Sequence, residues 1–388
     1  MAIYFAFALT AIHEGSLRAA NVLLVLYAVE LGASPFVVGL LAAMFSICPA
    51  LIAVQAGKLA DRFGARWLLL TGAAAGTLGM LVPYLFAGVA ALFAGAVGMG
   101  VLDALFVVCV QNIVGLQSTP ENRARNYSNY SLIGSTAGLS GPLIAGFSID
   151  YLGHAAGCAI VALITLIPIV LILSRNDELR VGTPPAAHAQ GGMWEMLSDP
   201  GVRRTLITSS FLAAGSNLYL FYMPVYAHDA GLSASSIGFV ISANAAAIFV
   251  VRAILPNLLA RYGEDRVLTL AFYVEAVSLM LIPFFKDAYV LALLSFIFGL
   301  GMGGGGPIIT MLMFARSAQG RSGEGLGLKI TVNHLTKMVS PLVFGAMGSA
   351  LGLLPMFVFN ALLMVGGGYL SRPNKPRSRS VDDAKSTK

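Results

Sequence analysis

The chain has 388 residues, of which 57% are hydrophobic and 11% are charged, and its formal net charge is +6. Soluble domains carry about 25% charged residues, so this composition excludes a soluble enzyme and a soluble nucleic-acid-binding domain. A helix that crosses a bilayer needs about 20 apolar residues, and a chain of this length has room for about twelve such helices and little else.

Twelve apolar segments are long enough to cross a bilayer, and each is predicted to form one helix. A polar stretch rich in Gly, Pro and Ala separates the first six from the last six. The predicted domains are an N-terminal six-helix bundle (1–173), a cytoplasmic linker (174–203), a C-terminal six-helix bundle (204–371) and a disordered basic cytoplasmic tail (372–388). The expected spans are 3–29, 36–56, 67–87, 90–116, 127–150, 155–173, 204–227, 237–259, 267–285, 288–315, 326–351 and 354–371.

The basic residues between the spans predict the orientation. If the N-terminus is cytoplasmic, almost all Lys and Arg residues of the connecting segments, Lys329 among them, lie on the cytoplasmic side, and Lys286 alone lies outside. Cytoplasmic loops are enriched in Lys and Arg, so both termini are expected in the cytoplasm of a plasma-membrane protein, or of an inner-membrane protein in a bacterium. No cleaved signal peptide, metal site or cofactor is expected, and Cys48, Cys109 and Cys158 lie scattered within spans.

The loop after the second span carries the most specific motif. Residues 57–66 read Gly-Lys-Leu-Ala-Asp-Arg-Phe-Gly-Ala-Arg. This segment resembles the signature loop between helices 2 and 3 of the major facilitator superfamily of secondary transporters, and departs from it only at Ala65, where a basic residue is usual. Its glycines let two helix ends approach, and its charged side chains are suited to a latch that forms and breaks as a transporter alternates. The residues of this gating motif are Gly57, Asp61, Arg62, Gly64 and Arg66.

The chain also repeats itself at an offset of 199 residues. One offset that holds through both halves predicts two pseudo-symmetric bundles of six helices each, which is also the fold that the resemblance implies. Asp61 corresponds to Ala260, so the gating motif is degenerate in the second half. The aligned segments are 27–39 with 226–238, 62–64 with 261–263, and 142–146 with 341–345.

The fifth span contains a second motif, over residues 137–146. It resembles the antiporter motif of the superfamily, with Ala137 and Ala145 at two glycine positions. Small residues permit close helix packing and a Gly-Pro step bends a helix, although such steps are common in membrane helices of any function. The arginine that drug/proton antiporters carry in helix 4 is replaced by Ala94, which weakens a drug-efflux interpretation. The motif residues are Gly138, Gly141, Pro142 and Gly146.

Ionisable side chains in the middle of spans are the best candidates for function, because each is costly when it faces lipid. The resemblance implies that helices 1, 4, 7 and 10 line a central cavity, with contributions from helices 2, 5, 8 and 11. Glu275 on the ninth span would lie outside it. A purely structural role remains open for the Glu14–Arg18 pair, which is spaced i,i+4, and for His334. The candidate substrate and proton-pathway residues are Glu14, Arg18, Asp103, Arg252, His334 and Lys337.

These observations favour a secondary active transporter of a small solute that works by alternating access and is coupled to protons. Three basic groups against two acids (Arg18, Arg252 and Lys337 against Glu14 and Asp103) favour a small organic anion as the substrate. Proton-antiport efflux of amphipathic compounds is the alternative, and a membrane sensor that has lost transport is a third. No nucleotide-binding loop, nucleophile–base pair or metal-ligand cluster suggests an enzyme. The expected partners are a small-molecule substrate, protons and the lipid bilayer, without nucleic acid, and the protein is expected to be a monomer.

Overall fold

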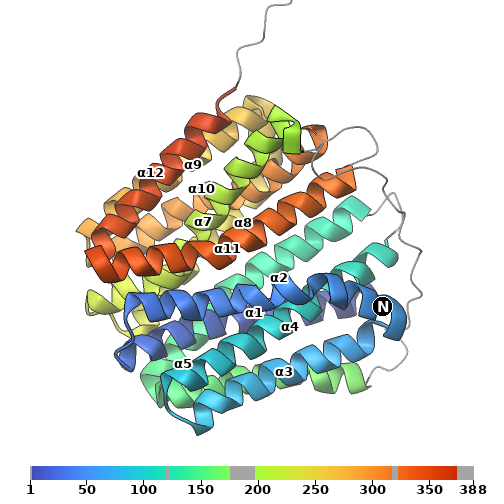
Figure 1. Cartoon of the computed structure of the whole chain (residues 1–388), viewed down its shortest axis with the longest axis vertical. Coiled ribbons are helices and arrows are strands. Elements are labelled where there is room, and N and C mark those ends of the chain that lie inside the picture. Colours follow the sequence, from blue (N-terminus) through green and yellow to red (C-terminus); the bar gives the residue numbers. More distant parts are fainter. Residues whose placement is uncertain (1, 119–122, 175–196, 317–321, 374–388) are drawn as a thin grey trace, which may run out of the picture.

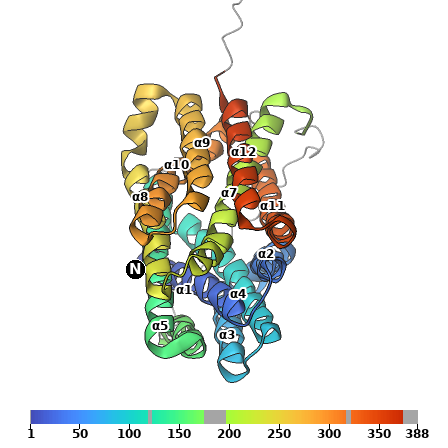
Figure 2. The same ribbon diagram turned by 90° about the vertical axis from the view of Figure 1, so that its left-hand side faces the viewer.

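The computed structural model describes residues 2–118, 123–174, 197–316 and 322–373, and these residues form helices and no strand (Figure 1). Helices α1–α5 pack as one group and helices α7–α12 as another, with α1 and α2 beside α7 and α11 (Figures 1 and 2). The elements are α1 (Ala2–Glu30), α2 (Pro35–Phe63), α3 (Ala65–Leu85), α4 (Val89–Leu116), α5 (Arg123–Ser174), α7 (Pro200–Asp229), α8 (Ala234–Tyr262), α9 (Glu264–Leu281), η1 (Ile282–Phe284), α10 (Ala288–Arg316), α11 (Ser322–Leu351) and α12 (Leu353–Ser371).

Glycines with positive φ angles mark the sharp turns between helices, and they follow the sequence repeat. Three pairs of such glycines are separated by 199 residues, and the positive-φ region is open to glycine at little steric cost. Gly153 (φ 86°) breaks α5 into two helical spans, as the expected boundary between 127–150 and 155–173 requires. The two halves therefore turn at corresponding positions. The pairs are Gly32 with Gly231, Gly64 with Gly263, and Gly153 with Gly352.

Helix α7 begins four residues earlier than the span expected at 204–227. Pro200 occupies its first turn, and the Asp199 carboxylate accepts hydrogen bonds from the backbone N–H groups of Gly201 (2.7 Å) and Val202 (2.9 Å). Asp at the N-cap followed by Pro is a strong helix start, because the cap satisfies donors that the helix leaves unpaired. The predicted linker therefore overlaps the first turn of α7, and its residues 175–196 lie outside the described part of the chain. Residues 374–388 of the predicted tail lie outside it as well.

By length and composition, eight of the described helices are apolar enough to cross a membrane. One of them, Leu132–Ser174, has 43 residues and contains the break at Gly153, so it is long enough for two crossings. Helices α1, α7 and α11 do not belong to this set, although they have 29, 30 and 30 residues. Each carries polar side chains near its middle, such as Glu14, Asn217 and Asn333. For these three helices the expected crossing stays a prediction.

The outer surface fits a bilayer. Large apolar side chains are exposed on the helices that face away from the centre, including Leu163 (63%), Leu270 (65%) and Leu362 (59%). A soluble protein rarely exposes so much contiguous apolar surface, whereas lipid accommodates it. The two groups of helices contact each other mainly through α5 with α8 and α2 with α11, and to a smaller extent through α1 with α7. The surfaces of these helices therefore define the centre of the molecule.

Candidate functional site in the cavity between the two bundles

The two bundles meet tightly at the end of the molecule away from the N-terminus, on the left of Figure 1. Gly39 of α2 lies against the backbone oxygen of Pro341 in α11 and against the hydroxyl of Tyr222, which itself donates to that oxygen (2.8 Å). Gly238 of α8 lies in the same way against the backbone oxygen of Pro142 in α5. Only a residue without a side chain permits such an approach. Gly39 and Gly238 are repeat partners, as are Pro142 and Pro341, so the same contact is made twice.

Hydrogen bonds reinforce both contacts. The Asp150 carboxylate at the end of the first span of α5 accepts the backbone N–H groups of Ala234 (3.0 Å) and Ser235 (2.7 Å), which are the first residues of α8. At the equivalent place in the other pair, the Ser349 hydroxyl accepts the N–H of Phe36 (2.9 Å). A carboxylate at a helix N-terminus is favourable because it meets unpaired donors and the positive end of the helix dipole. We call these two contact regions together, α2 with α11 and α5 with α8, the closed gate.

A cavity with a volume of about 590 Å³ lies between the closed gate and the end where α1 begins. This is the size of a site for a drug-sized ligand, for which about 300–1,000 Å³ is usual. Eight helices line it: α1, α2, α4, α5, α7, α8, α10 and α11. The described lining residues include none from α3, α9, α12 or the second span of α5. This is the arrangement that the sequence resemblance implies.

All six candidate residues named from the sequence line this one cavity. Lys329 lines it as well and so belongs to a helix and not to a connecting segment, whereas its expected position on the cytoplasmic side stays a prediction. Helix α11 begins at Ser322, about two turns earlier, so Lys329 is already inside the helix, where its Nζ donates to the Thr310 hydroxyl (2.5 Å). Among the described lining residues there are therefore four basic groups and two carboxylates besides His334. The charged lining residues are Glu14, Arg18, Asp103, Arg252, Lys329 and Lys337.

On α1 the expected pair is present: Arg18 Nε lies 3.8 Å from Glu14 Oε2. The motif in the first span of α5 packs against α1, because Gly141 allows α5 to approach the Arg18 Cβ and the backbone oxygen of Gly15 closely. A Cβ at Gly141 would lie 2.6 Å from both atoms, so the small residue sets the α1–α5 spacing. Gly141 therefore packs bundle helices, whereas Pro142 and Gly146 of the same motif belong to the closed gate.

Asp103 has a partner that sequence reasoning missed. His13 of α1 places its Nε2 3.1 Å from Asp103 Oδ1, and its ring stacks on Phe106 with 5.2 Å between centroids. His13 is only 4% exposed, and its Nδ1 is buried without a hydrogen-bond partner among the described residues. A same-helix search for a partner could not find this pair, because the partner comes from another helix. The available signal was a histidine next to Glu14 in the middle of a span.

Polar contacts also tie helices together around the cavity. Asn217 of α7 donates to the backbone oxygen of Lys337 in α11 (2.9 Å), and Ser209 of α7 donates to the Asn333 amide oxygen (2.7 Å). Arg252 of α8 donates to the Ser135 hydroxyl of α5 and so bridges the two bundles. These contacts orient side chains of α7, α8 and α11 toward the space between the bundles.

Glu275 lies away from the cavity, as expected. It is fully buried in α9, next to Gly301 of α10 and close to Gly215 of α7, and neither carboxyl oxygen has a hydrogen-bond partner among the described residues. A buried carboxyl without a partner is costly in its ionised form. Glu275 is therefore part of the interior of the C-terminal group of helices and not of the cavity wall.

The gating motif is described only in part. Gly57, Asp61 and Arg62 fall in the last turns of α2, and their side chains lie outside the described part of the chain. Gly64 (φ 81°) separates α2 from α3, and Arg66 is half-buried at the start of α3. The latch formed by the charged residues of this motif stays a prediction.

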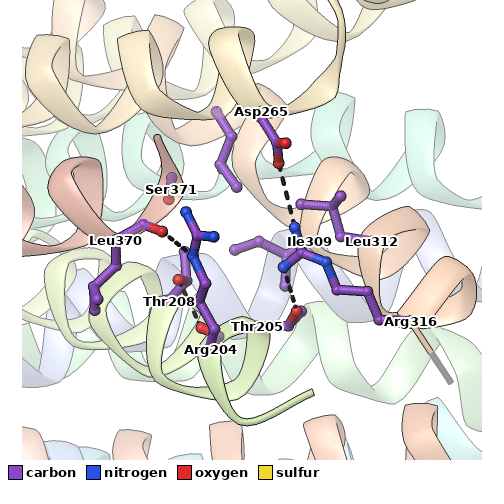
Figure 3. Close-up of a pocket in the computed structure, with 10 residues that line it drawn as sticks. Arg204, Thr205, Thr208, Asp265, Ile309, Leu312, Arg316, Leu370 and Ser371 are labelled. Atoms are coloured by element: carbon purple, nitrogen blue, oxygen red, sulfur yellow. Dashed lines mark hydrogen bonds and ion pairs between the residues drawn. The ribbon is translucent and has the colours of Figure 1, made fainter. Parts of the chain in front are cut away.

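At the same end of the molecule, the second half has a different set of polar contacts (Figure 3). Arg316 of α10 bridges Asp265 of α9 (3.4 Å) and the Thr205 hydroxyl of α7 (2.9 Å). Arg204 of α7 donates to the backbone oxygen of Leu370 in α12. Two arginines thus tie together four helix ends, in the half of the chain where the repeat partner of Asp61 is an alanine.

Comparisons with known proteins agree with this architecture. The family model described as Major Facilitator Superfamily matches residues 4–328 and 205–387. Curated relatives include an uncharacterised MFS-type transporter of Methanocaldococcus jannaschii (19% identical, covering 90% of this chain and 92% of the relative) and the quinolone resistance protein NorA of Staphylococcus aureus (25% identical, 83% of each).

Two solved structures show the same fold. The nucleoside transporter NupG superposes with a TM-score of 0.80 at 12% identity and covers 95% of this chain and 98% of its own. A bacterial homologue of the human lysosomal transporter Spinster, in an inward-facing and unoccupied conformation, gives a TM-score of 0.75 at 13% identity, with 95% and 96% covered. With the family model matched along the chain and the multi-helix membrane fold in place, the chain belongs to the major facilitator superfamily of membrane transporters.

Proposed function

We propose that this protein is a proton-coupled secondary active transporter of a small organic anion, which it moves across the plasma membrane by alternating access. The observation that carries the proposal is the charge of the cavity wall, where four basic side chains face two carboxylates. An excess of basic over acidic side chains is costly in a site of low dielectric constant. An anionic substrate offsets that cost, so the empty cavity attracts anions more than cations.

The basic groups come from both bundles. Arg18 belongs to α1, whereas Arg252, Lys329 and Lys337 belong to α8 and α11. Lys337 is close enough to Arg18, Asp103 and Glu14 for their charges to influence it, and all four residues line the cavity. An anion between Arg18 and Lys337 would contact both bundles at once. Its binding would therefore depend on how the bundles are arranged, which is what alternating access requires.

The closed gate supports the same mechanism. The two bundles make paired glycine contacts at one end of the molecule, and the cavity lies beyond those contacts. The basic residues of the connecting segments indicate that the end at which α1 begins is cytoplasmic. In this proposal the structure is the state with its cavity on the cytoplasmic side, and a rocking motion of the bundles opens the gate toward the outside.

Proton-antiport efflux of amphipathic compounds is the second candidate. Its support is the naming of two relatives, the quinolone resistance protein NorA and the multidrug resistance protein MdtG of Serratia proteamaculans, together with the Gly-Pro motif of α5. The helix 4 position at which drug/proton antiporters carry arginine is Ala94. The excess of basic groups in the cavity also disfavours a cationic drug.

Transport in proteoliposomes separates the two candidates. The panel consists of radiolabelled benzoate, lactate, succinate and phenyl phosphate as anions and tetraphenylphosphonium as a lipophilic cation, each with and without a pH gradient. We expect at least one anion to accumulate in response to the gradient, and Lys337→Gln to weaken its transport while the exposed Lys286→Gln does not. Gradient-driven movement of the cation, with no movement of any anion, would replace the anion proposal by the efflux one.

A further inference from the structure

A histidine and a carboxylate from two helices of the first bundle meet at the cavity wall. His13 Nε2 of α1 lies 3.1 Å from Asp103 Oδ1 of α4, and Asp103 is itself a lining residue. His13 does not itself line the cavity: its ring stacks on Phe106 and is almost fully buried. The histidine is therefore in contact with the cavity through Asp103, and this geometry makes the two residues one unit.

Few charged groups face this unit. Asp103 is close enough to Lys337 and His334 of α11 for their charges to influence it across the cavity, and Glu14 follows His13 in the sequence of α1. Helices α2, α5 and α7 also contact α1, but in the sequence their charged residues lie at span ends or near the break at Gly153. Lys337 in turn is close enough to Arg18 for the charge of Arg18 to influence it. The charge of the His13–Asp103 pair is therefore balanced chiefly from the second bundle.

We propose that the His13–Asp103 pair binds the coupling proton, and that the proton and the anionic substrate load together, so that transport is symport. The proposal rests on the proposed function above. Without a substrate, Lys337 is a counter-charge for Asp103. An anion that binds next to Lys337 takes over part of that counter-charge and leaves Asp103 with an excess of negative charge. A proton taken from the aqueous cavity by His13 restores the balance.

Protonation also strengthens the contact itself, because imidazolium and carboxylate form a charge-assisted hydrogen bond. Since coupling between two bound ligands is reciprocal, the proton favours the anion as much as the anion favours the proton. The sign of the coupling follows from the charge of the substrate: a cation in the same cavity would repel the proton and give antiport. Coupled sites of this kind typically change each other's affinity on the order of 10-fold.

Two transport assays on the full-length protein test the role of His13. Counterflow exchanges labelled for unlabelled benzoate without net proton movement, whereas accumulation driven by a pH gradient requires coupling. Lactate, succinate and phenyl phosphate are run in the same way. We expect His13→Gln to retain counterflow at saturating benzoate, with a raised half-saturating concentration, and to lose gradient-driven accumulation by on the order of 10-fold. The matched control is His228→Gln, because His228 lies away from the cavity and its ion-pair contact is with its neighbour Asp229 (3.9 Å).

A second measurement needs no variant. Purified protein in weakly buffered detergent solution should take up protons when benzoate or another transported panel anion is added, and His13→Gln should take up fewer. Proton release, or no proton change on anion binding, overturns the proposal. So does a His13→Gln protein that accumulates the anion as the wild type does. If the wild type neither binds nor moves any panel anion, the proposed function fails first, so the two failures are distinguishable. If His13→Gln does not reach the membrane, Asp103→Asn replaces it in the proton-uptake measurement, and wild-type uptake by that variant overturns the role of the pair.

Discussion

Because glycines form the contacts of the closed gate, a single Gly→Ala substitution should lower the stability of the closed-gate state. A Cβ at Gly238 would collide with the backbone oxygen of Pro142, would lie 3.2 Å from the carbonyl carbon of Pro142 and would lie 3.5 Å from the Cα of Gly146. Backbone atoms cannot give way like the end of a flexible side chain, so the bundles must separate slightly. Overpacking of this kind costs about 1–3 kcal/mol. The cost falls on the closed gate and not on a state in which the gate is open.

Gly238→Ala should therefore shift the equilibrium toward the open gate. A penalty of about 2 kcal/mol corresponds to a change of about 30-fold in the population ratio. Gly366→Ala is the matched control, because its Cβ would make only an ordinary contact of 3.5 Å with Phe211. Both substitutions gain the same helix propensity of about 1 kcal/mol, so the comparison isolates the collision at the gate.

The assay is labelling of a cysteine in the cavity from the gate side. Ser46→Cys is introduced into protein whose three native cysteines are replaced by serine, because Ser46 lines the cavity. A membrane-impermeant maleimide added outside right-side-out vesicles reaches this position when the gate opens. We expect Gly238→Ala to raise the labelling rate by about 30-fold over Gly366→Ala. Equal rates in the two variants would show that the glycine contacts do not hold the gate shut.

Three further predictions concern polar groups. Asp150→Ala removes two hydrogen bonds to the start of α8, whereas Ser349→Ala removes one hydrogen bond to the start of α2. Each bond contributes about 1 kcal/mol to the closed gate, so Asp150→Ala should raise the rate of maleimide labelling at Ser46→Cys more than Ser349→Ala does. Equal labelling rates would contradict this ranking. Lys337→Gln should raise the half-saturating concentration of a transported anion by about 10-fold, which corresponds to a loss of about 1.4 kcal/mol of binding free energy. Lys286→Gln is the control and should leave this concentration unchanged. An unchanged half-saturating concentration in Lys337→Gln would refute the role of Lys337. Asp61→Asn should lower the initial rate of uptake when it is compared with the wild type at equal membrane expression. An initial rate equal to that of the wild type would refute the latch proposed for the gating motif.

The sequence predicted the cavity residues better than the contacts between them. A charge in the middle of an apolar span has few favourable environments, so Lys337 could be assigned to the interior from its position in the span. Arg252 lies closer to a span end, where it could also extend toward the membrane surface, and only the family resemblance placed it at the cavity. The partner of a residue depends on how helices are rotated and spaced, which one sequence does not specify. The contact between His13 and Asp103, 90 residues apart, is of this kind.

Errors at helix ends had a different cause. Lys329 was counted with the connecting segments although it lies within the expected span 326–351, and α11 begins even earlier, at Ser322. Asp150 is the last residue of the expected span 127–150, and its role at the start of α8 depends on the approach of the two bundles. The repeat offset pairs Asp150 with Ser349, and both accept backbone hydrogen bonds at the start of a helix in the other bundle.

The charges of the cavity are divided unequally between the two halves of the chain. Both carboxylates, Glu14 and Asp103, lie in the first half, and three of the four basic groups lie in the second. At the repeat positions the other half carries uncharged residues, such as Met302 for Asp103 and Gly138 for Lys337. The halves have thus kept a common backbone but have specialised. We expect changes that alter substrate preference to map to the second half, and changes that uncouple transport from its driving gradient to map to the first.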